Sequence, residues 1–270
     1  MRKQAVAMCG VVVAGLAAMF AFAGDLNPPA GPVTSTAKPL QEVEPRVGIQ
    51  NPSAFGSITI NEPGSYYLLE NIQGSATFDA IRITASDVTL DLNGFGVFAQ
   101  AFSPVGIRIG TNGSPVERVA VMNGSVSGFD DVGIDGEFAA AVLIDSVRVT
   151  DCDDGIEVRN GSQVLRSTAN DNTFRGIQVS FGSLAIGCTA RGNGADGMQA
   201  FQSVIRDSTA SDNNRGFFVS EGAVVECVAY GNASTGITAG STSLVNGCAA
   251  VNSPTRFSIS GSSTIVDSNN

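Results

Sequence analysis

The sequence predicts an all-β fold, a parallel β-solenoid in which successive turns of the chain stack along one axis. Two observations lead to this prediction. Gly, Val, Ile, Thr, Ser and Asn are abundant and only 15% of the residues are charged, which favours strands and turns over helices. In addition, self-similar units of about 20 residues follow one another along the C-terminal half, and no helical period runs through them.

The repeated unit is a short apolar strand, an Asn-containing turn, and then a Gly-apolar-x-apolar strand. Successive units read "SQVLRSTANDNTFRGIQVSFG", "SLAIGCTARGNGADGMQAFQ" and "SVIRDSTASDNNRGFFVSEG". Leucine-rich repeats have a similar length, but their L-x-x-L-x-L frame is absent, and a propeller blade would need about twice as many residues. We therefore expect about eight coils of 18–27 residues over residues 76–270.

Three segments precede these coils. Residues 1–23 combine a basic start, an apolar run and a final "AFA", the pattern of a secretory signal peptide cut after Ala23, with a retained membrane anchor as the alternative. Residues 24–54 contain six of the ten prolines and are expected to form an extended lead-in or linker. Residues 55–75, with a strand-turn-strand pattern, are the candidate N-terminal cap.

The charge and the cysteines restrict the partners and the compartment. Loss of Arg2 and Lys3 with the signal peptide changes the net charge from −10 to −12, which argues against nucleic acid and anionic membranes as partners. The protein is expected to be exported, with no membrane span after cleavage. Cys152, Cys188, Cys227 and Cys248 are expected to pack inside, and a disulfide between the last two is the alternative.

Side chains alternate inward and outward along each strand. One column of apolar residues is predicted to face the core, and the residue after each of them is predicted to face solvent. The inward column is Ile81, Ile107, Ile134, Ile156, Ile177, Met198, Phe217, Ile237 and Phe257, and the outward one is Arg82, Arg108, Asp135, Glu157, Gln178, Gln199, Phe218, Thr238 and Ser258. Asn172, Asn193, Asn213 and Asn232 fall at equivalent turns, where an amide ladder is expected.

The Gly-Ile and Asn-turn units, together with "DVTLDLNGFGV", resemble the right-handed parallel β-helix proteins of the pectate-lyase-like superfamily. The lead-in "PPAGPVTSTAKPLQEVEPR" and "PGSYYLLENI" are similar to a mostly uncharacterised secreted bacterial subgroup. The resemblance implies a single-stranded right-handed β-helix. It does not fix the activity, because the superfamily includes polysaccharide lyases, hydrolases, uronate epimerases and phage tailspikes.

The sequence contains no histidine, which excludes His-dependent nucleophiles and His-ligated metals. The Gly-His-Gly and Asp-Pro-His motifs of two superfamily branches are also absent. The candidate catalytic residues are Arg108, Asp135 and Glu157: stacking places the two acids about 5 Å apart, near the separation in retaining glycosidases. Arg108 would bind a uronate carboxylate or act as a lyase-type base. The alternative is a surface ion-pair ladder.

Two further groups of residues are candidates for binding. A polysaccharide would contact Arg82, Gln178, Gln199 and Phe218 of the outward column. The sequence indicates no organic cofactor. Calcium is a candidate ligand of the turn residues Asp130, Asp131, Asp153 and Asp154; the alternative is that these aspartates hydrogen-bond nearby backbone.

Three functions follow. The first is a carbohydrate-associated binding or surface-scaffold protein of unknown ligand. The second is a polysaccharide lyase or glycoside hydrolase acting on an acidic polysaccharide, and the third is a purely structural or adhesive solenoid.

Overall fold

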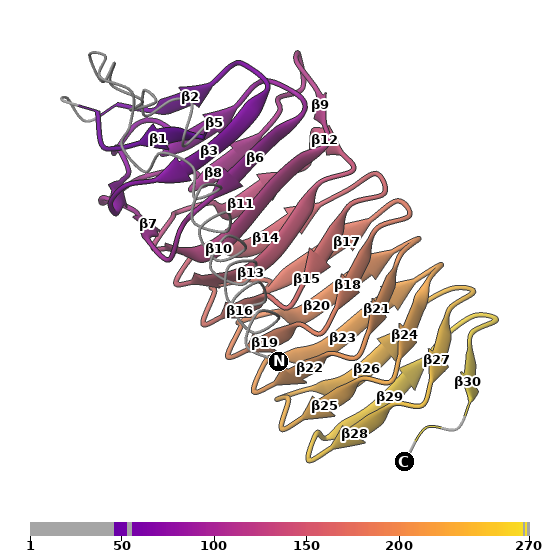
Figure 1. Cartoon of the computed structure of the whole chain (residues 1–270). Coiled ribbons are helices and arrows are strands. Elements are labelled where there is room, and N and C mark those ends of the chain that lie inside the picture. The colour runs from indigo at the N-terminus through magenta and orange to yellow at the C-terminus, as the bar shows by residue number, and fades with distance from the viewer. Residues whose placement is uncertain (1–45, 53–55, 267, 269–270) are drawn as a thin grey trace, which may run out of the picture. The chain divides into compact units, whose positions relative to one another are not determined.

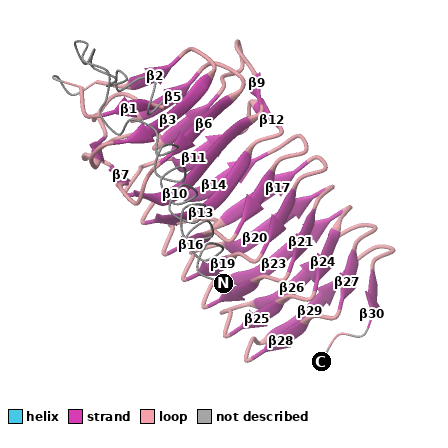
Figure 2. Ribbon diagram, in the orientation of Figure 1, coloured by secondary structure: helices cyan, strands magenta, loops and turns pink. Residues whose placement is uncertain are grey.

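The computed structural model describes residues 46–52, 56–266 and 268. These residues form a parallel β-helix in which nearly every turn contributes one strand to each of three faces (Figure 1). The described part of the chain contains strands and turns but no helix (Figure 2), and hence no helix that could span a membrane. The predicted signal peptide and most of the Pro-rich lead-in lie outside the described residues.

One face of the solenoid is a ten-stranded parallel sheet, in which each strand pairs with the equivalent strand of the next turn. Its strands are β2 (Ile58–Ile60), β5 (Ile81–Ile83), β8 (Ile107–Ile109), β11 (Val132–Gly136), β14 (Asp154–Val158), β17 (Ile177–Ser180), β20 (Asp196–Phe201), β23 (Arg215–Ser220), β26 (Thr235–Ala239) and β29 (Thr255–Ile259).

The other two faces belong to one eighteen-stranded sheet made of two rows, which β10 and β13 join by running through both. The first row is β1 (Val47–Ile49), β3 (Gly64–Leu68), β6 (Val88–Asp91), β10 (Val119–Ser127), β13 (Leu143–Thr150), β15 (Gln163–Leu165), β18 (Leu184–Ile186), β21 (Val204–Arg206), β24 (Ala223–Val225), β27 (Leu244–Asn246) and β30 (Thr264–Val266). The second row adds β4 (Ile72–Gln73), β7 (Gly96–Phe98), β16 (Thr168–Asn170), β19 (Thr189–Arg191), β22 (Thr209–Ser211), β25 (Val228–Tyr230) and β28 (Ala249–Val251).

A two-stranded ribbon of β9 (Val116–Glu117) and β12 (Ala139–Ala140) interrupts the regular turns beside β8 and β11. It arises where two successive turns carry longer connections. The solenoid begins earlier than the sequence predicts, because β2 already pairs with β5. The ten strands of the first face therefore give ten turns instead of eight. That residues 55–75 also shield the end of the solenoid stays a prediction.

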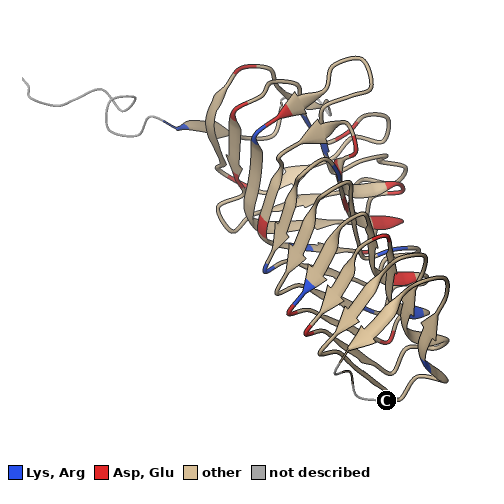
Figure 3. Ribbon diagram, turned by 90° about the vertical axis from the view of Figure 1, so that its right-hand side faces the viewer, with Lys and Arg blue, Asp and Glu red and all other residues tan. Residues whose placement is uncertain are grey.

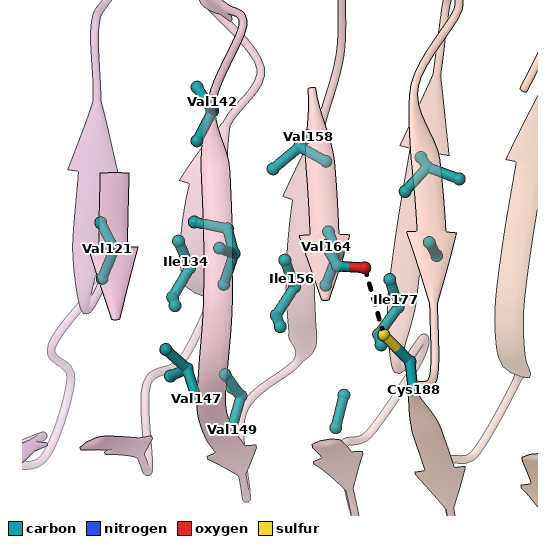
Figure 4. Close-up of a cluster of buried hydrophobic side chains, with 14 of the residues drawn as sticks. Val121, Ile134, Val142, Val147, Val149, Ile156, Val158, Val164, Ile177 and Cys188 are labelled. Carbon is teal, nitrogen blue, oxygen red and sulfur yellow. Dashed lines mark hydrogen bonds between the residues drawn. The ribbon is translucent and has the colours of Figure 1, made fainter. Parts of the chain in front are cut away.

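The interior is a continuous apolar column, and the predicted inward register is confirmed strand by strand. Ile134 pairs with Ile156, and Ile156 with Ile177, and all three are buried. Figure 4 shows these residues packed with valines from the opposite sheet. The four described cysteines, Cys152, Cys188, Cys227 and Cys248, are buried and free. The thiol of Cys188 donates to the carbonyl oxygen of Val164, 3.4 Å away (Figure 4). Packing, and not a disulfide, is their role in this structure.

The predicted amide ladder is also confirmed. Asn172, Asn193, Asn213 and Asn232 are buried one above another at the corner that precedes the ten-stranded sheet. Nδ2 of Asn172 donates to Oδ1 of Asn193 over 2.8 Å, and Nδ2 of Asn193 donates to Oδ1 of Asn213 over 2.9 Å. Each side chain thus satisfies polar groups of the neighbouring turns, which keeps the corner in register.

Candidate functional site

The outer face of the ten-stranded sheet carries the predicted functional column in the predicted order. Arg108 pairs with Asp135, Asp135 with Glu157, and Glu157 with Gln178. Gln178 continues to Gln199 and then to Phe218. Residues from six consecutive turns therefore lie in one row, at the strand spacing of about 4.8 Å.

The middle of this row is not exposed, contrary to the expectation that the whole column faces solvent. Asp135 is 5% exposed, Glu157 9% and Gln178 6%. Arginines from the same and neighbouring turns bind these side chains and shield them from solvent.

At the N-terminal end, two arginines share one buried acid that the sequence analysis did not single out. Arg82 donates to Oδ2 of Asp79 through Nη2 (2.7 Å), and Arg108 donates to the same oxygen through Nε (2.9 Å). Arg108 also donates to Oδ2 of Asp135. Burial lowers the pKa of Arg108, but the carboxylates of Asp135 and Asp79 more than offset it, so the pKa is raised. A raised pKa argues against Arg108 as a base.

In the middle of the face, Glu157 accepts several hydrogen bonds on one oxygen. Nη2 of Arg159 and Nε2 of Gln178 each donate to Oε1 of Glu157 over 2.8 Å. Arg159 also forms a 2.9 Å ion pair with Glu137 of the preceding turn. Among the described residues, no side chain binds Oε2 of Glu157.

Both column acids titrate at higher pH than an ordinary carboxyl group. Burial raises the pKa of Asp135, although the backbone N–H of Glu137 and the charge of Arg108 oppose this shift. Burial likewise raises the pKa of Glu157 against the opposing effect of Arg159. The desolvation of these carboxylates therefore outweighs their ion pairs.

Further along the column, two more ion pairs lie beside Gln178, Gln199 and the aromatic rings of Phe201 and Phe218. Arg175 binds both oxygens of Asp154, at 3.0 and 2.7 Å, and also donates to Oε1 of Gln178 and of Gln199. Its guanidinium therefore fixes the two stacked amides as well as the ion pair.

Arg215 binds both oxygens of Asp196, each at 2.7 Å, and lies 4.4 Å from the centre of the Phe218 ring. Phe201 packs edge-on against Phe218, with ring centroids 5.5 Å apart. Arg215 thus packs on one face of the Phe218 ring, while both rings remain partly exposed and together present an aromatic surface.

Two groups of residues make up this surface. The ion-pair network is Asp79, Arg82, Arg108, Asp135, Glu137, Asp154, Glu157, Arg159, Arg175, Asp196 and Arg215, and the amide–aromatic strip is Gln178, Gln199, Phe201 and Phe218. Acidic and basic residues recur on successive turns in Figure 3. The network corresponds to the ion-pair alternative expected for this column, but it extends over more residues than the column alone predicts.

The acidic turns do not form a metal cluster. Among the described residues, no three carboxylates or thiols lie close enough together to hold a metal ion. Asp154 is bound by Arg175, while Asp130 and Asp131 are exposed and Asp153 partly buried. Burial raises the pKa of Asp131; the charge of Arg108 opposes this shift, and the charges of Asp154 and Asp153 add to it.

A shallow pocket of about 560 Å³ adjoins the ion-pair network at the β9–β12 ribbon. Its wall includes Glu137, the partner of Arg159, but not Arg108, Asp135 or Glu157. Its lining residues are Ser86, Asn112, Pro115, Val116, Glu117, Glu137, Phe138, Ala139, Ala140 and Asn160. Glu137 and Phe138, which follow β11, thus provide one side of this pocket.

The comparisons with solved structures concern the fold. The enzymatically active domain of tailspike protein 2 from bacteriophage CBA120 superposes with a TM-score of 0.58 at 17% identity, over 77% of this chain and 41% of that one. Pectate lyase Pel9A gives 0.47 at 17% identity, over 83% and 68%. The periplasmic alginate epimerase AlgG gives 0.46 at 12% identity, over 79% and 70%. The chain thus spans less than half of the tailspike domain.

No curated protein matches the sequence. The family model described as "Right handed beta helix region" matches residues 105–270, which is more than half of the chain and includes every strand from β8 to β30. Together with the three-faced stacking of parallel strands, this match shows that the chain belongs to the right-handed β-helix family.

Proposed function

We propose that this protein binds carbohydrate along the outer face of its ten-stranded sheet. The observation that carries the proposal is the amide–aromatic strip, where Gln178, Gln199 and Phe218 occupy one register row and Phe201 packs against the last of them. The partly exposed amide of Gln199 offers hydrogen-bonding groups, and an aromatic ring offers an apolar surface to the C–H face of a sugar. The buried amide of Gln178 supports that of Gln199 from the preceding turn.

The network of arginines and acids supports this proposal by holding the strip rigid. Arg175 fixes both amides through its Nη1, and Arg215 fixes the ring of Phe218. Side chains already held in place lose little conformational entropy when a ligand binds. Export, predicted from residues 1–23, would give the protein access to extracellular or cell-wall polysaccharide and is part of the proposal.

The test is a binding measurement on a broad panel of soluble polysaccharides. Phe218→Ala should weaken binding about five- to tenfold, because an aromatic contact contributes about 1 kcal/mol. Gln199→Ala provides a second change on the same strip. Tyr230→Ala is the matched control, since Tyr230 is 49% exposed on β25 of the other sheet. Wild-type protein that binds nothing on the panel would refute the proposal and favour a structural solenoid.

An enzymatic function is the second candidate, and one observation favours it. Asp135 and Glu157 are register partners on adjacent strands, and burial raises the pKa of both, as a general acid requires. The tailspike domain with the same fold is described as enzymatically active. The geometry supports binding better, because Arg108 binds Asp135 and Arg159 binds Glu157.

This candidate predicts turnover of an acidic polysaccharide such as pectate or alginate, with new chain ends or unsaturated products. Glu157→Gln should abolish turnover. Glu226→Gln, an exposed carboxylate of the other sheet paired with Arg206, is the matched control. A wild-type protein that binds a polysaccharide without changing its chain length would exclude hydrolysis and lyase cleavage and leave the binding function.

A further inference from the structure

The ionic partners on the proposed binding face indicate which class of glycan it takes. Every positive charge of the described residues belongs to an arginine, because the sequence has no lysine after Lys38 and no histidine. Ten of the twelve described arginines form an ion pair with Asp or Glu. The two described arginines outside any ion pair are Arg148 and Arg256.

Neither of these two arginines serves the amide–aromatic strip. Arg148 lies on β13 in the other sheet. Arg256 lies on β29, two turns beyond Phe218, because Phe218 pairs with Thr238 and Thr238 with Ser258. A ligand on the strip therefore meets no cation that is free of a protein carboxylate.

The network itself is acidic. Its five arginines, Arg82, Arg108, Arg159, Arg175 and Arg215, face six carboxylates, Asp79, Asp135, Glu137, Asp154, Glu157 and Asp196. The same excess extends into the adjoining pocket, where Glu117 and Glu137 line the wall and their arginine partners, Arg118 and Arg159, each bind a second acid as well. A polyanion beside the network or in this pocket would therefore meet an excess of negative charge.

The groups that remain available suit hydroxyl donors. Among the described residues, nothing binds Oε2 of Glu157, and Gln199 uses only its carbonyl oxygen, which accepts from Arg175. A carboxylate oxygen accepts hydrogen bonds from sugar hydroxyls, and the free amide of Gln199 donates to a ring or hydroxyl oxygen. The aromatic pair adds an uncharged surface.

From this pairing of charges we infer that the ten-stranded face binds neutral, hydroxyl-rich polysaccharide and rejects polyuronates and sulfated or phosphorylated glycans. The inference rests on the proposed function and specifies its ligand class. It differs from the expectation of an acidic polysaccharide, because Arg108 is already bound to Asp79 and Asp135, so two protein carboxylates already balance its charge.

The experiment compares immobilised neutral glycans (a β-glucan, a xylan and a galactomannan) with polygalacturonate and alginate, at about 50 mM and about 500 mM NaCl. The expected result is binding of at least one neutral glycan that changes less than about twofold with salt, since no charge on the ligand is screened. Polygalacturonate and alginate should bind at least about tenfold more weakly. Salt-sensitive binding of a polyuronate, tighter than any neutral glycan, would overturn the inference and leave the proposed function standing, whereas a failure of every glycan to bind refutes both.

A gain of binding tests the physical reason directly. Asp196→Asn frees Arg215 beside Phe218 and keeps the size of the side chain, so polygalacturonate binding at low salt should increase about tenfold. Asp212→Asn makes the same charge change by freeing Arg191 on the other sheet and should have no effect. Equal gains in both variants, or no gain in a folded Asp196→Asn protein, would contradict the assignment of ligand class to these ion pairs.

Discussion

Substitution of Asn193 by alanine tests how much the buried amide ladder contributes to stability. Asn193 is 1% exposed, and its Oδ1 accepts from both the backbone N and Nδ2 of Asn172, at 3.1 and 2.8 Å. Those two donors have no other partner among the described residues. A buried donor left without a partner costs about 1–3 kcal/mol, so Asn193→Ala should lower the free energy of unfolding by about 2–6 kcal/mol.

The measurement is equilibrium unfolding in urea, followed by circular dichroism. Asn214→Ala is the matched control, because Asn214 is exposed at the equivalent corner of the next turn and should change stability by less than about 0.5 kcal/mol. The slope with denaturant should be equal in all three proteins, so that the midpoint reports stability. A loss below about 1 kcal/mol for Asn193→Ala would show that water or a rearranged corner satisfies Asn172, and that the ladder is not a major source of stability.

Three other predictions concern the backbone, the buried acids and the thiols. Gly197→Ala should destabilise the protein, because the added Cβ would lie 2.7 Å from the carbonyl oxygen of Gly216 on the next turn. Gly113→Ala, with open space around the added Cβ, should leave the stability unchanged, and urea unfolding of the two variants measures the difference. Burial raises the pKa of Glu157 above 4.5, so the folded state binds a proton at this carboxyl more readily than the unfolded state does. The melting temperature of the wild type should therefore rise relative to that of Glu157→Gln as the pH falls from neutral towards 4.5. A difference in melting temperature that does not change with pH would contradict this. Burial raises the pKa of the Cys188 thiol to about 11, so iodoacetamide at neutral pH should label it only after denaturation, as mass spectrometry would show.

The fold and the register were predictable because each follows from a period in the sequence. A strand alternates with period two, and a turn of nearly constant length places equivalent residues next to each other. The register from Arg82 through Glu157 to Ser258 follows directly from these two facts. The pairing of β2 with β5 was not anticipated, because the first turns depart from the Gly-apolar pattern that identifies the later ones.

The burial of the column could not be predicted from the column alone. Asp135 is covered by Arg108 of the column, whereas Glu157 is covered by Arg159, which lies outside the column and also binds Glu137 of the preceding turn. Arg159 is two residues after Glu157 and lies on the same outward side, but it follows the end of β14 and has no partner in the strand register. The column alone therefore does not show that Arg159 covers Glu157.

A signal for those partners was nevertheless present in a second column. The residue before each Gly of the Gly-apolar step reads Asp154, Arg175, Asp196 and Arg215 on four successive turns, and alternation of sign at the turn spacing predicts ion pairs between neighbours. The structure contains two of the three such pairs, Asp154 with Arg175 and Asp196 with Arg215. In a solenoid, the column of residues along the middle of a sheet must be compared with the columns at the ends of its strands. Taken alone, a column of acids suggests an active site; with the neighbouring arginines included, the same acids form ion pairs. The comparison therefore bears on the ligand class, because arginines that are already paired with protein carboxylates are less available to an anionic sugar.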